Sequence, residues 1–348
     1  MRYFDYSKLS DRKWPKEVVN YVGLIHEFKG RQQLYLQQRP EELNRLIEVA
    51  KRQSTEASNE IEGIRTTNSR LVQLMSDKTT PRDRDEEEIL GYRYALSLIH
   101  ESFEYIPIRT NYILQLHKEM YQFMDVNYGG RFKDTPNEID VIHEDGAKEV
   151  LFRPLDPFET PAAVDSLCVE YNKATGEYSI DPLLVIPVFI HDFLCIHPFN
   201  DGNGRMSRLL TTLLLYKSGF VVGRYISLEK KNQITKAEYY DALSRSSKRW
   251  HDGQNDDTPF VLYFLGTVLA AYRDFEERVD LVSTKRSAKE TVINAVNKQI
   301  GTFTKTDIME LCPEIGSSSI ESSLKQLCEE GVIEKRGGGR STYYVRSQ

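Results

Sequence analysis

The sequence predicts a mostly α-helical protein with one small β-hairpin in its middle and a separate module at its C-terminal end. Apolar residues recur at spacings of three and four through most of the chain, while short apolar alternations are confined to residues 127–157 and 332–346. A chain of 348 residues is long enough for two or three domains. We expect an N-terminal helical region over residues 1–80, a core over residues 81–283 and a C-terminal module over residues 287–348.

Composition and charge place the chain among globular cytoplasmic proteins. The formal net charge of -6 gives no support for bulk affinity to nucleic acid or to a membrane. The four cysteines are scattered without a C-x-x-C pair, which favours a reducing compartment. Residues 1–15 contain no apolar signal core. The most apolar stretch, residues 183–196, is too short to span a bilayer and contains His191 and Asp192.

Helices dominate the first third of the sequence. Val18, Val22 and Ile25 belong to one buried helical face, and a second helix begins with Pro40 and stops near Gly63. A polar connection with an acidic end then leads into a further helix. Residues 109–124 supply another.

The middle of the chain changes pattern and then returns to helices. Glycines, prolines and short apolar alternations over residues 127–157 predict a loop with a small hairpin. Residues 160–176 form a helix, and residues 181–196 form a core helix with Asp181 as its N-cap, apolar on nearly every side. Further helices follow over residues 205–218, 236–246 and 259–282.

The C-terminal module shows three helical segments followed by two short strands around three glycines, an outline typical of a winged helix-turn-helix. Lys335, Arg336 and Arg340 in the wing could contact DNA phosphates. The recognition helix over residues 317–331, however, carries one lysine against three glutamates, whereas phosphate binding needs more positive charge. DNA binding therefore stays open beside the favoured role in protein contact or dimerisation.

The most informative stretch of the sequence is HPFNDGNGRMSR, residues 197–208, directly after the core helix. Two glycines around an asparagine, placed before a helix N-terminus, can aim several backbone N–H groups at one anion, usually a phosphate. Arg205 and Arg208 lie three residues apart, so we expect both to reach phosphate oxygens from one side of the helix. Asp201 is a natural Mg²⁺ ligand beside a polyphosphate, and His197 can act as a general base. This set of residues predicts attack on a nucleotide phosphate.

Of two other chemistries considered at this loop, one is excluded and the other is disfavoured. A P-loop requires a Gly-Lys-Ser/Thr ending, which the loop lacks. Zinc is disfavoured because His191 and His197 lie six residues apart without an H-E-x-x-H pattern or cysteine partners. We expect His191 to be a core histidine bonded to the backbone.

Residues 197–208 resemble the signature of the Fic (filamentation induced by cyclic AMP) family, H-x-F-x-(D/E)-G-N-G-R-x-x-R, at every fixed position. The resemblance covers residues 1–280 and implies a Fic-type helical bundle that transfers AMP from ATP to a Ser, Thr or Tyr hydroxyl of a target protein. In that reaction His197 would deprotonate the hydroxyl, and Asp201 would hold Mg²⁺ on the α- and β-phosphates.

The resemblance also implies how the loop would bind ATP. The amides of Gly202, Asn203 and Gly204 would take phosphate oxygens. Arg205 and Arg208 would bind the departing pyrophosphate portion, and Phe199 would pack the loop down. Modification of the chain itself and a homodimer are further partner hypotheses.

An upstream segment, SNEIEG, resembles the family's inhibitory pattern (S/T)-x-x-x-E-(G/N) at Ser58, Glu62 and Gly63. Ser58 and Glu62 lie four residues apart, hence on one helical face. By resemblance, Glu62 would pair with Arg208 and deny it to the γ-phosphate of ATP. Some members of this class also remove AMP with the same glutamate, so removal of AMP stays open as a second activity.

Two more segments resemble parts of the family's site. Residues 129–143 match the place of the flap, a hairpin whose edge could hold a target segment by strand addition. Tyr239 and Tyr240 fall in a segment that resembles the lining of the adenine pocket.

The alternative hypothesis is a DNA-binding regulator whose Fic core senses a nucleotide without catalysis. The intact His197 argues against it, because a sensor has no use for a base at that position.

Overall fold

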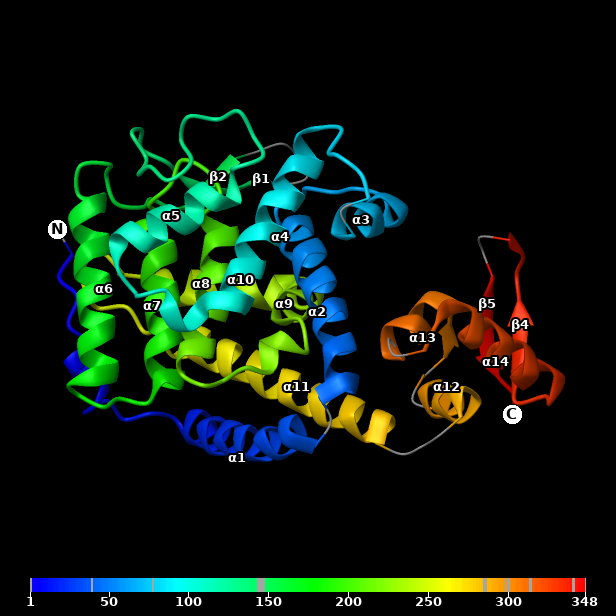
Figure 1. Cartoon of the computed structure of the whole chain (residues 1–348). Coiled ribbons are helices and arrows are strands. Elements are labelled where there is room, and N and C mark those ends of the chain that lie inside the picture. The colour runs from blue at the N-terminus through cyan, green and yellow to red at the C-terminus, as the bar shows by residue number, and fades with distance from the viewer. Residues whose placement is uncertain are drawn as a thin grey trace.

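The computed structural model describes residues 2–38, 40–76, 78–142, 148–283, 287–297, 299, 301–312, 315–339 and 342–347. It shows a large helical body and a small C-terminal module, each with its own apolar core (Figure 1). The helices of the body are α1 (Lys16–Gln38), α2 (Pro40–Ile61), α3 (Asn68–Met75), α4 (Arg84–Ser102), α5 (Thr110–Met120), α6 (Thr160–Gly176), α7 (Pro182–Ile196), α8 (Asn203–Lys217), α9 (Leu228–Ile234), α10 (Lys236–Ser247) and α11 (Thr258–Ser283).

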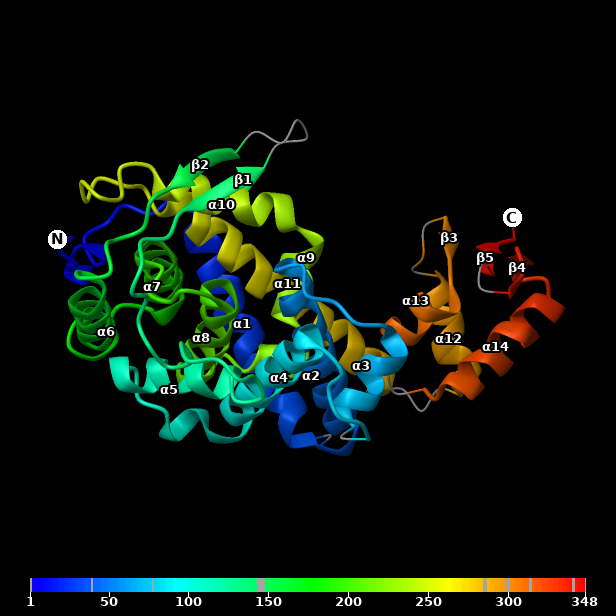
Figure 2. The ribbon, with the colours of Figure 1, turned by 90° about the horizontal axis from the view of Figure 1, so that it is seen from above.

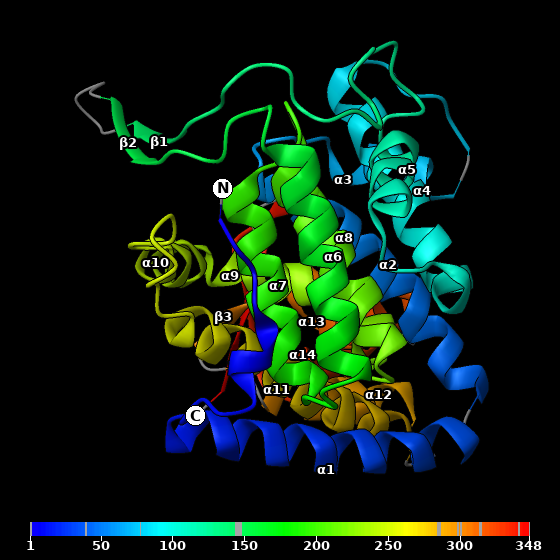
Figure 3. The same ribbon diagram turned by 90° about the vertical axis from the view of Figure 1, so that its left-hand side faces the viewer.

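Helices α7 and α8 lie at the centre of the body (Figure 3). Helix α7 packs against α6, α8 and α11, while α8 also contacts α4 and α2. The sequence dictates where α7 begins, because the Asp181 carboxylate accepts the N–H of Leu183 at 2.9 Å and Pro182 occupies the first helical turn. Both central helices are buried along nearly their whole length, as the apolar sequence of α7 predicts.

The turn between α7 and α8 is formed by two residues with left-handed backbones. His197 has φ 52° and ends α7, and Gly202 has φ 80° and is the N-cap of α8. The sequence predicts a start of α8 near Arg205, but the helix begins at Asn203, because the left-handed Gly202 already turns the chain into the helical direction.

The predicted hairpin is present as β1 (Ile139–Ile142) and β2 (Lys148–Phe152). The strands pair antiparallel, with an irregularity between Ile139 and Asp140. Viewed from above, the hairpin lies over the side of the body that carries α10 (Figure 2). His143, the last residue of the flap segment identified in the sequence, lies outside the described residues.

The C-terminal module consists of α12 (Ala288–Asn297), β3 (Thr302–Phe303), α13 (Lys305–Leu311), α14 (Ser317–Glu329), β4 (Ile333–Arg336) and β5 (Tyr343–Arg346). The sequence predicts two strands here, and the structure adds β3, which pairs with β5 so that the order is β3-β5-β4. The extra strand forms because Phe303 is buried and stacks on Tyr344, with ring centroids 5.8 Å apart. Residues 284–286 of the expected domain boundary and Arg340 of the expected wing lie outside the described residues.

None of the helices in the described ranges is both long enough and apolar enough to cross a membrane.

Candidate active site

His197 follows the last turn of α7. Its Nδ1 lies 3.2 Å from the carbonyl oxygen of Leu194. Since a carbonyl only accepts hydrogen bonds, Nδ1 carries the proton and Nε2 keeps a free electron pair. Burial lowers the pKa of His197 to about 4, so the imidazole is neutral at pH 7. The residue thus has the protonation state that a general base requires.

The loop after His197 is folded around Phe199 and Asn203. The Asn203 side chain accepts the N–H of Phe199 at 2.9 Å and donates to its carbonyl at 2.7 Å. The Phe199 ring is fully buried, in agreement with the expected packing role. The Asn203 side chain is therefore engaged in hydrogen bonds within the loop, and only the backbone N–H of Asn203 is available for an anion.

His117, which was not predicted from the sequence, supports the loop from α5. Its ring stacks on Phe199 with centroids 3.7 Å apart, and its Nε2 donates to the carbonyl of Asp201 at 3.0 Å. The N–H of Gly130 donates to Nδ1 at 2.9 Å, which fixes this tautomer, and burial lowers the pKa of His117 to about 4. The only sequence signal was a histidine on the buried face of an amphipathic helix.

The two glycines of the loop allow close approach. A Cβ on Gly202 would lie 2.6 Å from Met120 Cε and 2.8 Å from the Tyr121 hydroxyl, and its positive φ disfavours any side chain. A Cβ on Gly204 would lie 2.3 Å from Oε1 of Glu62. The Glu62 carboxylate thus lies against the first turn of α8, where the unpaired N–H groups of a helix attract an anion.

Arg208, on α8, contacts the end of α2 through hydrogen bonds. Its Nε donates to the Ser58 hydroxyl at 2.8 Å, and its Nη2 donates to the Ser58 carbonyl at 2.9 Å and to Glu62 Oε1 at 2.7 Å. Burial disfavours the charge of Arg208, but the Glu62 carboxylate together with Tyr239 and Tyr92 outweighs this effect, so the pKa of Arg208 is raised. The ion pair that the sequence resemblance implies is therefore present. Gly63, with φ 86°, turns the chain directly after it.

Arg205 differs from expectation. It does not share the surroundings of Arg208 but points toward α4 and α5, where it is 1% exposed. Its Nη1 lies 2.5 Å from Glu88 Oε2 and its Nη2 donates to the Tyr121 hydroxyl at 2.8 Å. The reason is the buried Glu88 carboxylate, which forms an ion pair with the Arg205 guanidinium and so holds it away from the position of a phosphate. In this structure Arg205 holds the loop against α4 and presents almost no surface to a ligand.

Asp201 is the residue of the loop whose carboxylate faces solvent, with its side chain 43% exposed. Its Oδ1 accepts the N–H of Gly202 at 2.6 Å, and its Oδ2 lies 3.5 Å from Nη2 of Arg84. Across the described part of the chain, no group of three or more His, Cys, Asp or Glu residues could hold a metal. A single exposed carboxylate next to an anion cradle nevertheless fits Mg²⁺, which takes one or two carboxylates together with phosphates and waters.

The two tyrosines of α10 differ in exposure. Tyr239 is buried against Phe260 and Tyr263, and it lines a cavity of about 20 Å³ behind Arg208, which has room for about one water. Tyr240 is 43% exposed. Tyr239 is thus a core residue in this structure, and Tyr240 is the one of the pair whose ring a base could reach.

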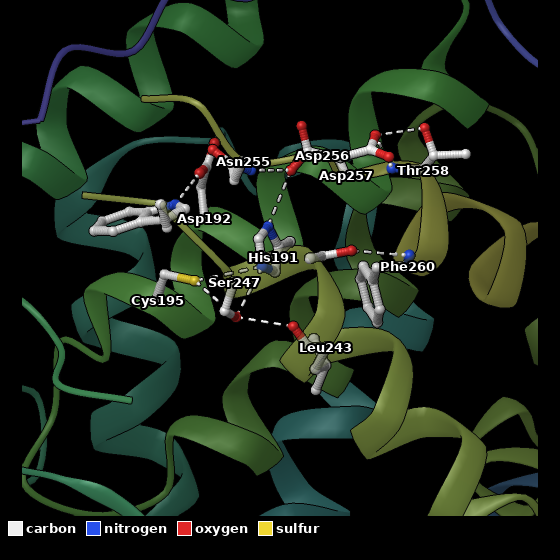
Figure 4. A network of polar contacts seen from close by, with 12 residues as sticks. His191, Asp192, Cys195, Leu243, Ser247, Asn255, Asp256, Asp257, Thr258 and Phe260 are labelled. Carbon is white, nitrogen blue, oxygen red and sulfur yellow. Dashed lines mark hydrogen bonds and ion pairs between the residues drawn. The ribbon is translucent and has the colours of Figure 1, made fainter. Parts of the chain in front are cut away.

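His191 is buried, as expected, but its partners are side chains rather than the backbone (Figure 4). Its Nδ1 lies 3.1 Å from Asp257 Oδ1 and its Nε2 lies 3.1 Å from the Ser247 hydroxyl. The adjacent Asp192 accepts hydrogen bonds from the Trp250 indole and the Tyr6 hydroxyl. This network fixes α7 to the segments before α1 and after α10, and His191 and Asp192 at its centre are buried.

Comparison with known proteins agrees with these features. Residues 107–215 match the model of the Fic/DOC family. A Fido domain-containing protein from Dictyostelium discoideum is 29% identical over 147 residues, which cover 40% of this chain and 98% of that protein. Protein adenylyltransferase fic-1 from Caenorhabditis elegans is 27% identical over 183 residues, which cover 52% of this chain but only 32% of that protein. The chain therefore spans about a third of the length of this second relative.

Solved structures share the fold. A Fic family protein from Desulfovibrio desulfuricans G20 superposes with a TM-score of 0.62 at 21% identity, covering 97% of both chains. Fic-1 from C. elegans superposes with a TM-score of 0.57 at 22% identity, covering 77% of this chain and 73% of that one. The chain has a mostly helical Fic fold, and its residues 107–215 match the Fic/DOC family, with distant similarity to Fic protein adenylyltransferases.

Proposed function

We propose that this chain is a protein adenylyltransferase that moves AMP from ATP to a Ser, Thr or Tyr hydroxyl of a target protein and is held inactive by Glu62. The observation that carries the proposal is the placement of a neutral histidine, an exposed carboxylate and a helix N-terminus on one short loop. Relatives named protein adenylyltransferases support the choice of reaction.

In the proposed reaction His197 accepts the proton of the target hydroxyl through Nε2, since Nδ1 is held by Leu194. The hydroxyl oxygen forms a bond to the α-phosphorus, and the bond to the departing pyrophosphate breaks. The backbone N–H groups at the start of α8 stabilise the negative charge on the phosphate oxygens. Mg²⁺, when bound with ATP, would neutralise phosphate charge, and Asp201 is the residue that would hold it.

Glu62 inhibits this reaction in two ways in our proposal. It neutralises Arg208, which is then not free to bind a phosphate. Its carboxylate also lies close to Gly204 at the N-terminus of α8, so a phosphate would meet a negative charge at the same place. Both effects end when the carboxylate is removed.

Intact-mass spectrometry after incubation with ATP and Mg²⁺ tests this proposal. The Glu62→Gly variant should gain the mass of one or more adenylyl groups or transfer them to added protein, and the unchanged chain should gain far less. Glu60→Gly is the matched control, because it also places glycine at the end of α2 but leaves the partner of Arg208 in place.

Two results would contradict the proposal. Adenylyl transfer by the Glu62→Gly, His197→Ala double variant would show that His197 is not the general base of the reaction. A folded Glu62→Gly variant that transfers nothing to itself or to protein from a source lysate would remove the proposed activity.

A further inference from the structure

The backbone that carries His197 is held by a segment that comes before the flap. Four consecutive carbonyl groups, those of residues 196–199, accept hydrogen bonds from Lys133 and Asn137. Lys133 Nζ donates to Ile196 at 3.0 Å and the Lys133 N–H donates to Pro198 at 2.9 Å. Asn137 Nδ2 donates to His197 at 3.4 Å and to Phe199 at 3.1 Å. We call Lys133 and Asn137 the carbonyl clamp.

The clamp contains a buried positive charge. Lys133 is 3% exposed, and burial lowers its pKa to about 8, so it still carries its charge at pH 7. Its ammonium group also donates to Asn137 Oδ1 at 2.9 Å, which orients the Asn137 amide toward the loop. A buried charge is costly unless it is well bonded, and here the carbonyl of Ile196, the last residue of α7, accepts a hydrogen bond from the ammonium group at the negative end of the helix dipole.

The clamp holds an unfavourable backbone conformation in place. A left-handed conformation is uncommon for a residue with a side chain and needs support from its surroundings, and His197 adopts it with φ 52° and ψ 62°. With the carbonyls on both sides of His197 fixed, its Cα–Cβ bond has one direction, and the imidazole keeps its bond to Leu194. Without the clamp, the loop could relax toward ordinary backbone angles.

The clamp also connects this loop to the flap. Asn137 lies two residues before Ile139, the first residue of β1, so the strand and the histidine are joined by one short, hydrogen-bonded segment. A second link is the bond from Asn200 to Asp134 at 3.0 Å. We propose that Lys133 and Asn137 are positioning residues that hold His197 in its reactive geometry and tie it to the strand that would receive the target. Only the effect of these residues on the rate of AMP transfer rests on the proposed function; the effect on the geometry of His197 does not.

The kinetic test uses the full chain with Glu62→Gly as the parent. Lys133→Met keeps the length of the side chain but removes the charge and its hydrogen bonds, and Asn137→Ala removes the amide. In both variants kcat should fall by about 10- to 100-fold, since a small misplacement of a reacting group costs about this much. The KM for ATP should not change, because neither residue lies at the N-terminus of α8. Arg131→Met is the matched control: it removes a charge from an exposed side chain in the same segment and should leave kcat unchanged.

A second readout does not depend on transfer. The rate of hydrogen exchange at the C2 position of each histidine, followed by mass spectrometry against pH, reports the pKa of His197. The charged groups that act on His197 are Lys133, Glu62 and Asp201. With Glu62 absent from the parent and Asp201 unchanged, Lys133→Met should raise the pKa of His197, and Arg131→Met should not. In Asn137→Ala, backbone amide exchange over residues 131–137 should become faster, because the carbonyls of His197 and Phe199 on both sides of Pro198, the acceptor of the Lys133 N–H, are then no longer held by Asn137.

The outcomes separate the two proposals. If the parent transfers no AMP, the proposed function fails, and the histidine and amide exchange data still decide whether the clamp exists. Unchanged kcat in both Lys133→Met and Asn137→Ala, or unchanged exchange at His197 and residues 131–137, would overturn the inference. If Lys133→Met does not fold, the kinetics and amide exchange of Asn137→Ala alone decide between these outcomes.

Discussion

The bond between Ser58 and Arg208 gives the sharpest quantitative prediction. Ser58 is buried, and its hydroxyl accepts from Arg208 Nε at 2.8 Å. Ser58→Ala removes this acceptor but keeps the Ser58 carbonyl and the Glu62 carboxylate as partners. The substitution therefore removes one of three bonds that keep Arg208 turned toward α2.

The size of the effect follows from the type of bond. A hydrogen bond to a charged group contributes about 1.5–3 kcal/mol, and a buried donor left without an acceptor costs a similar amount. Because 1.4 kcal/mol corresponds to about a tenfold change in an equilibrium constant, the inhibited arrangement should weaken by roughly 10- to 100-fold at most. We expect adenylyl transfer by Ser58→Ala to rise above that of the unchanged chain while staying below that of Glu62→Gly.

Stability should move in the opposite direction. The same lost bond should lower the free energy of unfolding by about 1.5–3 kcal/mol in urea titrations. Activity that rises while stability falls is a combination that simple damage to the protein does not produce. In the Glu62→Gly parent, Ser58→Ala should add little activity, since residues in one hydrogen-bond network are not additive.

The reasoning would be refuted by either of two results. The first is a folded Ser58→Ala variant whose transfer is no greater than that of the unchanged chain. The second is full additivity of the two substitutions, which would mean that Ser58 and Glu62 do not act through the same guanidinium group.

Three further predictions concern buried charged and polar groups other than Ser58, Glu62 and Arg208. Glu88→Gln leaves the buried charge of Arg205 with only the more distant Asp201 carboxylate, 3.7 Å from its Nη2, and should lower the free energy of unfolding by about 3–5 kcal/mol at most, measured by urea titration; an unchanged midpoint would contradict this. His117→Phe keeps a ring against Phe199 but loses both hydrogen bonds of His117, at a cost of about 1–3 kcal/mol, and faster proteolysis within residues 197–202 should accompany the loss. The hydrogen bond from Arg70 lowers the pKa of Glu86 from 4.5 to about 2, so this carboxylate contributes stability above pH 4.5 that is lost as the pH falls toward 2. Thermal unfolding of Glu86→Gln should therefore show a weaker decrease of Tm in that pH range than the unchanged chain, and parallel curves would argue against the assignment.

Local sequence rules predicted the elements around the site well. The helices over residues 160–176 and 181–196 begin and end almost where expected, because a proline, an aspartate cap and a glycine mark their ends directly. The strand β3 was not predicted, since two residues carry too little pattern, and its formation depends on the partner strand β5 at the far end of the module.

The loop itself shows where local rules stop. The residues that would act on phosphate are consecutive and could be identified by their types. The residues that fix the loop are not: Lys133, His117 and Glu88 come from three earlier segments, and His117 lies 84 residues before its partner Asp201. Arg205 is the clearest case, because its sequence position suggests a phosphate ligand and only the buried Glu88 reveals its actual direction.

The loop over residues 197–202 and Glu62 differ in how firmly they are held, and this difference bears on regulation. The loop is bonded to α5, to the segment before β1 and to α4 by buried groups, which hold its shape without a ligand. Glu62 differs, because it follows the last residue of α2, its side chain is 32% exposed, and Gly63 with φ 86° comes next. The buried face of α2 near this end includes, beside Ala57 and Ile61, several polar residues held by hydrogen bonds, among them Ser54, Ser58 and Asn59. Bonds of this kind exchange for bonds to water at a small net cost, whereas buried apolar side chains do not. In the proposed function, an activating signal would therefore act most readily at the end of α2, and the loop over residues 197–202 would need no rearrangement of its own.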